Sequence, residues 1–160
     1  MVVRLGTLAD VCAVLRNDAS QLANTAAAMG LRLPLDAASA GDWVSDCFSH
    51  GVLLTAIQDD PERAVALCKA SYVRVAWRRL NLSMWVADVT DGLTYVDAFV
   101  RSAFALTDAR FIELRLADSL EWISGLDQRG FSKEATYPEF LSLAGRRVDQ
   151  HIFALHRTDP

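Results

Sequence analysis

Cysteine is scarce in this chain, and its spacing excludes two kinds of cross-link. The three cysteines, Cys12, Cys47 and Cys68, lie far apart, and none belongs to a Cys-x-x-Cys pair. Disulfide frameworks use even-numbered sets of cysteines, and structural zinc sites use closely spaced ligands. We therefore expect buried, reduced thiols, no metal site, and a location in the reducing cytoplasm.

Long apolar runs are also absent. A helix that spans a bilayer needs about 20 consecutive apolar residues, and no stretch of this sequence reaches that length. Asp10 and Arg16 interrupt the apolar segment that an export signal would need near the N-terminus. The sequence thus favours a cytoplasmic protein without a membrane partner.

Excess positive charge is missing as well. The formal net charge is −4, and the arginines at 78–79 and 146–147 form isolated pairs rather than a stripe. A surface that binds duplex nucleic acid needs clustered cations that displace counterions. Nucleic acid is therefore not an expected partner.

The composition that remains is that of a globular protein. The chain has 160 residues, of which 52% are hydrophobic and 22% are charged. This length supports one sizeable core, and this apolar content argues against disorder. No repeat or linker divides the sequence, so we expect a single domain over 1–160.

Hydrophobic spacing alternates between the periods of helices and strands. In 80–86, for example, every second residue from Leu80 is apolar and points to one side, whereas Asn81, Ser83 and Trp85 point to the other. This is the period of a strand. Gly30 follows a helical pattern and is expected to end it. The predicted strands are 2–5, 52–57, 64–75, 80–86, 111–116, 134–143 and 148–156; the predicted helices are 8–15, 18–29, 34–51, 93–104 and one around 120–126; a turn is predicted at 59–62. The fold class is α/β, with mixed strand directions.

Several local sequences, in this order, resemble one enzyme superfamily. They are Ala103-Phe104 at the end of a helix, the strand at 111–116, Gly130-Phe131, and the final segments 145–149 and 152–157. Together they are similar to the Gcn5-related N-acetyltransferases, or GNAT superfamily, and within it to the branch that acetylates the alanine of ribosomal proteins. The resemblance covers about half of the chain.

The resemblance implies a fold and an activity. The fold is a mostly antiparallel sheet with flanking helices, in which the parallel strands 80–86 and 111–116 splay apart. The activity is acyl transfer from acetyl-CoA, or another acyl-CoA, to an amine of a small molecule or peptide. The acyl-CoA arm would lie between the splayed strands, and the pyrophosphate would lie at the start of the next helix. The implied cofactor-binding residues are Val86, Val89, Thr90, Gly92, Leu93 and Ser119.

The phosphate loop departs from the superfamily pattern. The pattern [RQ]-x-x-G-x-[GA] falls on Ala87–Gly92, where only the final glycine is retained. Thr90 replaces a glycine that permits close approach of the backbone to phosphate, and Asp88 and Asp91 add negative charge. An alternative is therefore a GNAT-fold protein that no longer uses CoA. Such a protein could take its acyl group from an acyl carrier protein, run different chemistry in the same cleft, or bind a partner without catalysis.

Two side chains are candidate catalytic residues. Asp88, at a strand end, could act as a general base, although a carboxylate that caps a turn explains it more simply. Ser119 could contact the acyl-CoA arm or cap the following helix, and Asp91 could cap the helix that begins at Gly92. Leu126 occupies the place where many members of the superfamily have a tyrosine that protonates the leaving thiolate, and leucine cannot donate a proton.

The remaining candidates concern substrate and assembly. Tyr72 and Trp85 could line a substrate cleft, or could belong to the core as aromatic residues on central strands usually do. Cys47 and His50 could form a nucleophilic pair, but Cys47 falls on an apolar stripe and an inert thiol is expected. The open edge of the sheet favours a homodimer that continues or exchanges strands.

Overall fold

The computed structural model describes residues 1–17, 19–34, 36–58 and 64–157, so the predicted turn at 59–62 lies outside the described residues. Within them, the strands are β1 (Val2–Leu5), β2 (Gly51–Ile57), β3 (Ala64–Arg74), β4 (Arg79–Val86), β5 (Phe111–Ala117), β6 (Ser132–Leu143) and β7 (Arg146–His156). The helices are α1 (Leu8–Val14), α2 (Ala19–Ala28), α3 (Ala37–His50) and α4 (Gly92–Leu106), and the 3₁₀ helices are η1 (Val75–Trp77), η2 (Val89–Asp91) and η3 (Glu121–Arg129).

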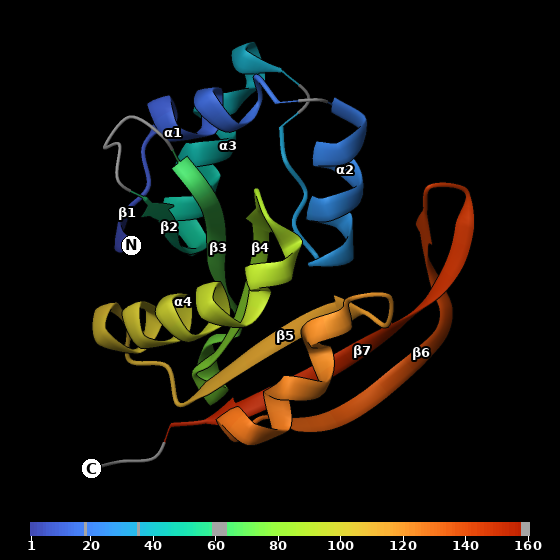
Figure 1. The fold of residues 1–160 in the computed structure, drawn as a ribbon. Coiled ribbons are helices and arrows are strands. Elements are labelled where there is room, and N and C mark those ends of the chain that lie inside the picture. The colour runs from blue at the N-terminus through green and yellow to red at the C-terminus, as the bar shows by residue number, and fades with distance from the viewer. Residues whose placement is uncertain (18, 35, 59–63, 158–160) are drawn as a thin grey trace.

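All the described strands form one sheet. Its order is β1-β2-β3-β4-β5-β7-β6, and every neighbouring pair is antiparallel except β4 and β5. The mixed, mostly antiparallel sheet with flanking helices confirms the predicted fold class. β6 forms one edge of the sheet (Figure 1), and the homodimer stays a prediction.

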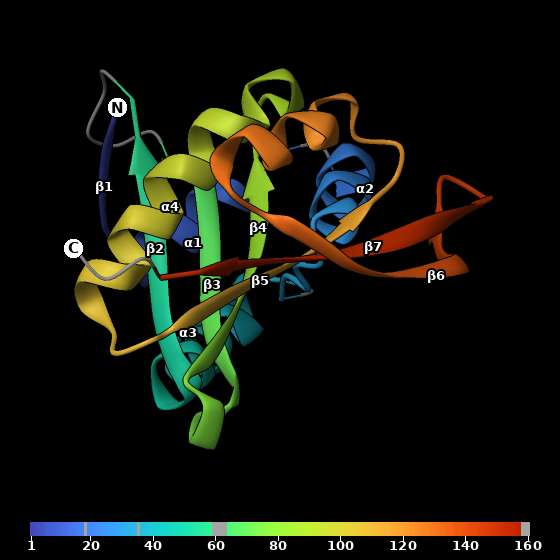
Figure 2. The ribbon, with the colours of Figure 1, turned by 90° about the horizontal axis from the view of Figure 1, so that it is seen from below.

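Helices cover both faces of the sheet. Figure 2 shows α4 on one face of β2, β3 and β4, with α1 and α3 on the other. Side chains alternate along a strand, so successive residues of β4 enter different cores. Leu82 and Met84 pack in the core that α4 covers, whereas Trp85 packs with Leu53 and Leu67 in the core beneath α1 and α3.

The parallel strands β4 and β5 pair over only part of their length. Their pairing ends at Leu82 and Leu114. β4 then continues to Val86 beside β3, and β5 continues to Ala117 beside β7. Figure 1 shows β5 turning away from β4. We call the space between 83–86 and 115–117 the wedge; it confirms the predicted splayed pair.

The end of α2 fills the base of this wedge. The Met84 N–H donates to the Met29 carbonyl oxygen at 3.1 Å, and Gly30 forms a parallel bridge with Met84. Gly30 has φ +73°, the left-handed conformation that was expected of a residue ending a helix. A Cβ atom at Gly30 would lie 3.1 Å from the Arg115 carbonyl oxygen, so glycine also permits this close approach to β5.

The helix predicted around 120–126 is a 3₁₀ helix rather than an α-helix. It ends at Gly130, whose φ of +81° terminates the segment. Gly125 lies in its middle, and glycine inside an α-helix is about 1 kcal/mol less favourable than alanine. A Cβ atom at Gly125 would lie 2.5 Å from the Cδ1 of Leu93, so glycine here leaves room for the Leu93 side chain of α4.

Polar contacts anchor the first helix to the sheet. Asp10 forms a capping box with Thr7 and accepts from both η nitrogens of Arg4, at 2.8 and 2.7 Å. Burial alone would raise the pKa of Asp10, but hydrogen bonds from Arg4 and Thr7 outweigh it, and the pKa is lowered. None of the described helices is long and apolar enough to cross a membrane.

Candidate active site

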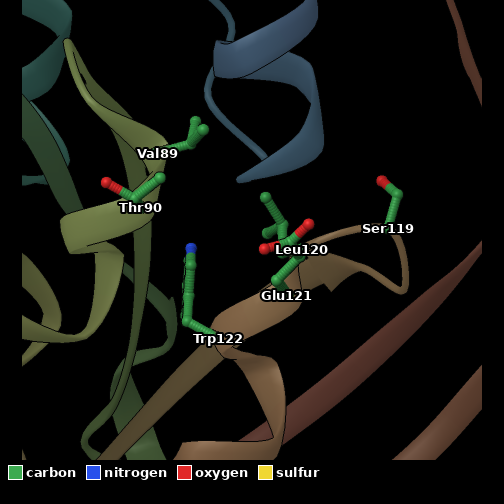
Figure 3. Close-up of a pocket in the computed structure, with 6 residues that line it drawn as sticks. All are labelled: Val89, Thr90, Ser119, Leu120, Glu121 and Trp122. Atoms are coloured by element: carbon green, nitrogen blue, oxygen red, sulfur yellow. The ribbon is translucent and has the colours of Figure 1, made fainter.

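A cavity of about 380 Å³ lies at the mouth of the wedge, where β4 and β5 end. Its lining residues are Val89, Thr90, Ser119, Leu120, Glu121 and Trp122 (Figure 3). The lining combines η2, which follows β4, with the start of η3, which follows β5. The structure therefore brings together three of the residues predicted to bind the cofactor: Val89, Thr90 and Ser119. We call this space the mouth cavity.

Trp122 supplies one wall of the mouth cavity. The side chain is buried, and its indole Nε1 has no hydrogen-bond partner among the described residues. Figure 3 shows the nitrogen pointing into the space between Thr90 and Leu120. A buried donor without a partner is unfavourable by about 1–3 kcal/mol, so it is a natural point of attachment for a ligand acceptor.

The same indole covers the first residue of α4. A Cβ atom at Gly92 would lie 2.2 Å from both Nε1 and Cε2 of Trp122. Glycine at this position is thus required by the packing of Trp122. In the sequence, Gly92 was the one residue that matched the phosphate-loop pattern. In the structure, the absence of a Cβ atom at Gly92 makes room for the Trp122 ring.

The turn before α4 is capped by the chain's own carboxylate. Asp88 Oδ1 accepts from the Thr90 N–H at 2.9 Å and from the Thr90 hydroxyl at 2.7 Å. The Gly92 N–H donates to the Val89 carbonyl oxygen. Both hydrogen bonds from Thr90 lower the pKa of Asp88, so its carboxylate is ionised at neutral pH. Asp88 therefore has the turn-capping role that the sequence favoured.

The prediction that the Asp91 side chain caps α4 was wrong. Asp91 occupies the N-cap position, but its side chain makes no capping hydrogen bond. Its backbone (φ −89°, ψ 12°) belongs to the preceding 3₁₀ turn instead of the extended conformation from which a side chain caps well. Asp88 performs the capping three residues earlier, at the start of η2.

Negative charge dominates this end of α4. The pKa of Tyr95 is raised, first by burial and then by the nearby Asp91 and Asp88 carboxylates. Glu121 adds a third carboxylate, and the mouth cavity is lined by no cationic side chain among the described residues. A pyrophosphate needs free N–H donors or cations. The residues present do not fit the pyrophosphate of CoA.

The backbone of β4 offers a donor inside the wedge. The Ala87 N–H bonds to the Val65 carbonyl oxygen of β3, so in an antiparallel ladder the N–H of Val86 points away from β3 and toward the wedge. The N–H of Met84 points the same way but already donates to Met29. Val86 was predicted to contact the cofactor; its side chain does not line the mouth cavity, and the contact stays a prediction. Leu93, also predicted, packs against Gly125 instead of lining the cavity.

Ser119 faces the mouth cavity and does not cap η3. The N-cap residue of η3 is Leu120, which has no capping side chain. The Ser119 hydroxyl is exposed and lines the cavity (Figure 3). Glu121, beside it, was missed by sequence reasoning, because an exposed glutamate in a helix normally has no special role.

Tyr72 and Trp85 lie away from the mouth cavity. The Tyr72 hydroxyl donates to Asp108 at the opposite end of β5; burial first and this hydrogen bond second raise its pKa. Trp85 is buried between the sheet and α1 and α3. Neither side chain lines the mouth cavity or the second cavity described next.

A second cavity, of about 550 Å³, opens beside the base of the wedge. Its lining residues are Ala27, Gly30, Leu31, Arg32, Val73, Asn81, Arg115, Phe140, Leu141 and Gln150. Among them, Arg32 and Arg115 are the charged residues, and both are cationic. Gly30 lines this cavity and contacts both strands of the wedge, because Arg115 and Ser83 are its nearest neighbours. No motif in the sequence indicated this cavity.

Hydrogen bonds orient the polar groups near the second cavity. Glu113, buried on β5, accepts from Arg115 Nε at 2.6 Å and from Arg79 Nε at 2.7 Å. Asn81 donates through Nδ2 to the Ser83 hydroxyl at 2.8 Å, while its Oδ1 has no partner among the described residues. Arg115 is thus held by one side of its guanidinium group, which leaves the other side for a ligand.

The two buried thiols, Cys47 and Cys68, are inert, as expected. Cys47 is buried, and burial raises its pKa to about 11, so it stays protonated at neutral pH. The His50 ring lies at the exposed end of α3 and contacts the Asp46 carbonyl oxygen at 3.1 Å. Cys47 and His50 therefore do not form a nucleophilic pair. Burial also raises the pKa of Cys68 strongly.

Solved structures of other proteins have the same fold as this chain. No family model matches the sequence, and no curated protein matches it. Among solved structures, a ribosomal-protein-alanine N-acetyltransferase from Brucella melitensis has a TM-score of 0.74 at 17% identity, covering 98% of this chain and 100% of that one. A spermidine N-acetyltransferase from Vibrio cholerae has a TM-score of 0.73 at 13% identity, covering 98% and 95%. An N-acetyltransferase from Staphylococcus aureus has a TM-score of 0.71 at 13% identity, covering 97% of each chain. The likeness shows the GNAT fold that the sequence predicted.

Proposed function

We propose that this protein transfers an acyl group from a thioester to an amine within the wedge. The observation that carries the proposal is the separation of β4 and β5 after Leu82 and Leu114, with a cavity at its mouth. The names of structures with the same fold support it, since spermidine and the alanine of a ribosomal protein are amine acceptors.

The reaction forms one bond and breaks another. The lone pair of the amine nitrogen attacks the thioester carbonyl carbon, a C–N bond forms, and the C–S bond breaks with release of a thiolate. Negative charge develops on the carbonyl oxygen in between. The N–H of Val86 is placed to donate to this oxygen, and such donors commonly lower the barrier by several kcal/mol.

Glu121 is our candidate for the proton acceptor. Its carboxylate lines the mouth cavity, whereas the carboxylate of Asp88 is engaged by Thr90. A carboxylate within hydrogen-bond reach can take the proton that the attacking amine loses. No acid is needed at Leu126, which is fully buried, because a thiol with a pKa of about 8–9 is a tolerable leaving group as the thiolate.

The second cavity suggests the kind of acceptor. Its charged lining residues, Arg32 and Arg115, favour a ligand with a carboxylate or another anion. Leu31, Val73 and Phe140 supply apolar surface at the same cavity. We therefore propose an acceptor amine that also carries an acidic group, with its amine directed past Gly30 toward the wedge.

A thiol-release assay tests the function. The purified protein is mixed with acetyl thioesters and pairs of amines that differ only by a carboxylate, such as an amino acid and its decarboxylated amine. We expect a higher kcat/KM for the acidic member of each pair. Glu121→Gln should lower kcat by about 10²-fold or more, the usual scale for general base catalysis. Glu139→Gln, on exposed β6, is the matched control.

Two results would count against the proposal. Release of thiol that no amine accelerates would mean that acyl transfer to an amine does not occur. Binding of thioester without any turnover would favour the alternative of a GNAT-fold binding protein.

A further inference from the structure

The start of α4 is the place where this fold would hold a nucleotide diphosphate, and here two of the N–H donors at this turn are already in use. Asp88 accepts from the Thr90 N–H, and the Gly92 N–H donates to Val89. An ionised carboxylate thus caps the turn that leads into α4, close to the place where an anionic ligand would gain from the helix terminus. A phosphate would have to displace a group of its own charge.

Packing closes the same surface. The Trp122 indole lies against the Cα of Gly92, since a Cβ atom there would be 2.2 Å from the ring. Trp122 belongs to the buried core and is held there by its neighbours. The close backbone approach that a glycine permits is therefore taken by an aromatic ring on the side of Gly92 where a Cβ atom would lie.

The charges at the mouth cavity add to this obstacle. Glu121 lines the cavity, and Asp88 and Asp91 belong to the turn that contributes Val89 and Thr90 to the lining. The pKa of Tyr95 is raised first by burial and then by the Asp91 and Asp88 carboxylates. Without a cation in the lining, three acidic side chains repel a ligand that carries several phosphates.

The cavity nevertheless offers groups that suit a different ligand. The Trp122 N–H is an unused donor, the Glu121 carboxylate is an acceptor, and the Ser119 hydroxyl can act as either. The Thr90 hydroxyl donates to Asp88 and can still accept. Val89 and Leu120 are apolar. A chain of secondary amides and methylene groups matches this set, because each amide presents one carbonyl acceptor and one N–H donor.

We propose that the acyl donor is recognised through a neutral, amide-bearing pantetheine arm, and that the nucleotide diphosphate of CoA contributes nothing to its binding. This inference rests on the proposed function. The arm enters at the mouth cavity, accepts a hydrogen bond from Trp122, and directs its thioester toward Val86. The arm can belong to a free acyl-pantetheine or to an acyl carrier protein, and the experiment separates these sources.

The experiment compares kcat/KM for acetyl-CoA, acetyl-pantetheine and an acetylated carrier protein, each with the same amine. We expect acetyl-pantetheine to equal or exceed acetyl-CoA. Raising the ionic strength from about 0.01 M to about 1 M shortens the Debye length from about 30 Å to about 3 Å. Because this weakens the repulsion, it should raise the kcat/KM for acetyl-CoA relative to that for acetyl-pantetheine. If the kcat/KM for the acetylated carrier protein exceeds that for free acetyl-pantetheine, the acyl donor is a carrier protein. If it does not, the acyl donor is a free thioester. Both results support the inference.

Three variants sharpen the comparison. Trp122→Phe keeps a ring but removes the N–H, and should lower kcat/KM for both small donors by about tenfold, the usual scale for one buried hydrogen bond. Trp77→Phe is its control, because Trp77 is an exposed residue of η1 and lines neither of the two cavities. Asp88→Ser retains a capping hydroxyl and removes the charge, so the ratio of acetyl-CoA to acetyl-pantetheine should rise. If Trp122→Phe fails to fold by circular dichroism, the Asp88→Ser ratio decides the matter.

The outcomes separate the inference from the function on which it rests. A preference for acetyl-CoA of more than about tenfold, equal to about 1.4 kcal/mol, would overturn the inference and leave acyl transfer intact. An unchanged donor ratio in Asp88→Ser would remove its electrostatic basis. Failure of all three donors to react would reject acyl transfer itself, and the inference with it.

Discussion

Replacement of Gly92 by alanine tests the packing on which the account of the phosphate site depends. Gly92 has helical backbone angles, φ −49° and ψ −41°, so alanine is allowed there. On backbone grounds alone, Gly→Ala at such a position stabilises a protein by about 0.4–1 kcal/mol. The new Cβ atom, however, would lie 2.2 Å from two atoms of the buried Trp122 ring. Overpacking of this kind is destabilising by about 1–3 kcal/mol, so we expect a net loss of about 1–2 kcal/mol.

Urea unfolding followed by circular dichroism measures this change, with Gly41→Ala as the matched control. Gly41 lies inside α3, and a Cβ atom there would meet nothing within 4 Å. Gly41→Ala should therefore stabilise the protein by about 0.5–1 kcal/mol, the usual gain for glycine in an exposed helix. The sign of the effect should thus differ between the two glycines.

A double-mutant cycle assigns the penalty to the indole. Trp122→Ala should be destabilising by about 3–5 kcal/mol, as truncation of a buried tryptophan usually is. In that background, Gly92→Ala should become neutral or stabilising, with a coupling free energy of about 2 kcal/mol. If Gly92→Ala were as stabilising as Gly41→Ala in the parent protein, the ring would not cover the start of α4. The Trp122 ring would then be no obstacle to a pyrophosphate at this helix terminus.

Three further predictions concern other parts of the molecule. Because the folded pKa of Asp10 is lowered, its carboxylate stabilises the protein above the unfolded pKa of about 3.9 and loses this effect as pH falls through the folded value. Asp10→Asn should therefore lower the free energy of unfolding at pH 7 and flatten its decline below about pH 4, measured by urea unfolding across pH. Arg115→Met should raise the KM for an acidic acceptor about tenfold or more, because charged hydrogen bonds contribute about 1.5–3 kcal/mol. The KM for the neutral counterpart should stay within about twofold. Equal changes for both amines would exclude a role of Arg115 in acceptor selection. Cys47, whose pKa is about 11, should resist alkylation at pH 7 in the folded protein and react only after unfolding, as mass spectrometry of the labelled chain would show.

The sequence predicted the order of elements well because each pattern is local. Alternation in 80–86 and the apolar spacing of 93–104 predicted β4 and α4, and the structure confirms both within a few residues. The apolar spacing around 120–126 predicted a helix without its type, and η3 is a 3₁₀ helix. Contact between Gly125 and Leu93 of α4, which no spacing reveals, accompanies the 3₁₀ geometry.

Part of the candidate site was also predictable. Val89, Thr90 and Ser119 were inferred from the resemblance and do line one cavity. The fold itself places the ends of β4 and β5 beside each other, so residues that follow these strands meet. Glu121 and Arg115 were not predicted, because their importance arises from the cavities that they line and not from their neighbours in sequence.

By itself, the sequence predicted which segments are strands and helices, and it showed that 87–92 and Leu126 depart from the patterns of the superfamily that the chain resembles. These properties depend on residue types and on spacings of a few residues. Only the tertiary structure decided that Trp122 covers Gly92, that Asp88 and not Asp91 caps the turn, and that two arginines share a cavity. The physical reason is that such contacts join residues tens of positions apart, and their distances are set by how β4, β5 and α2 pack together rather than by any periodic pattern along the chain.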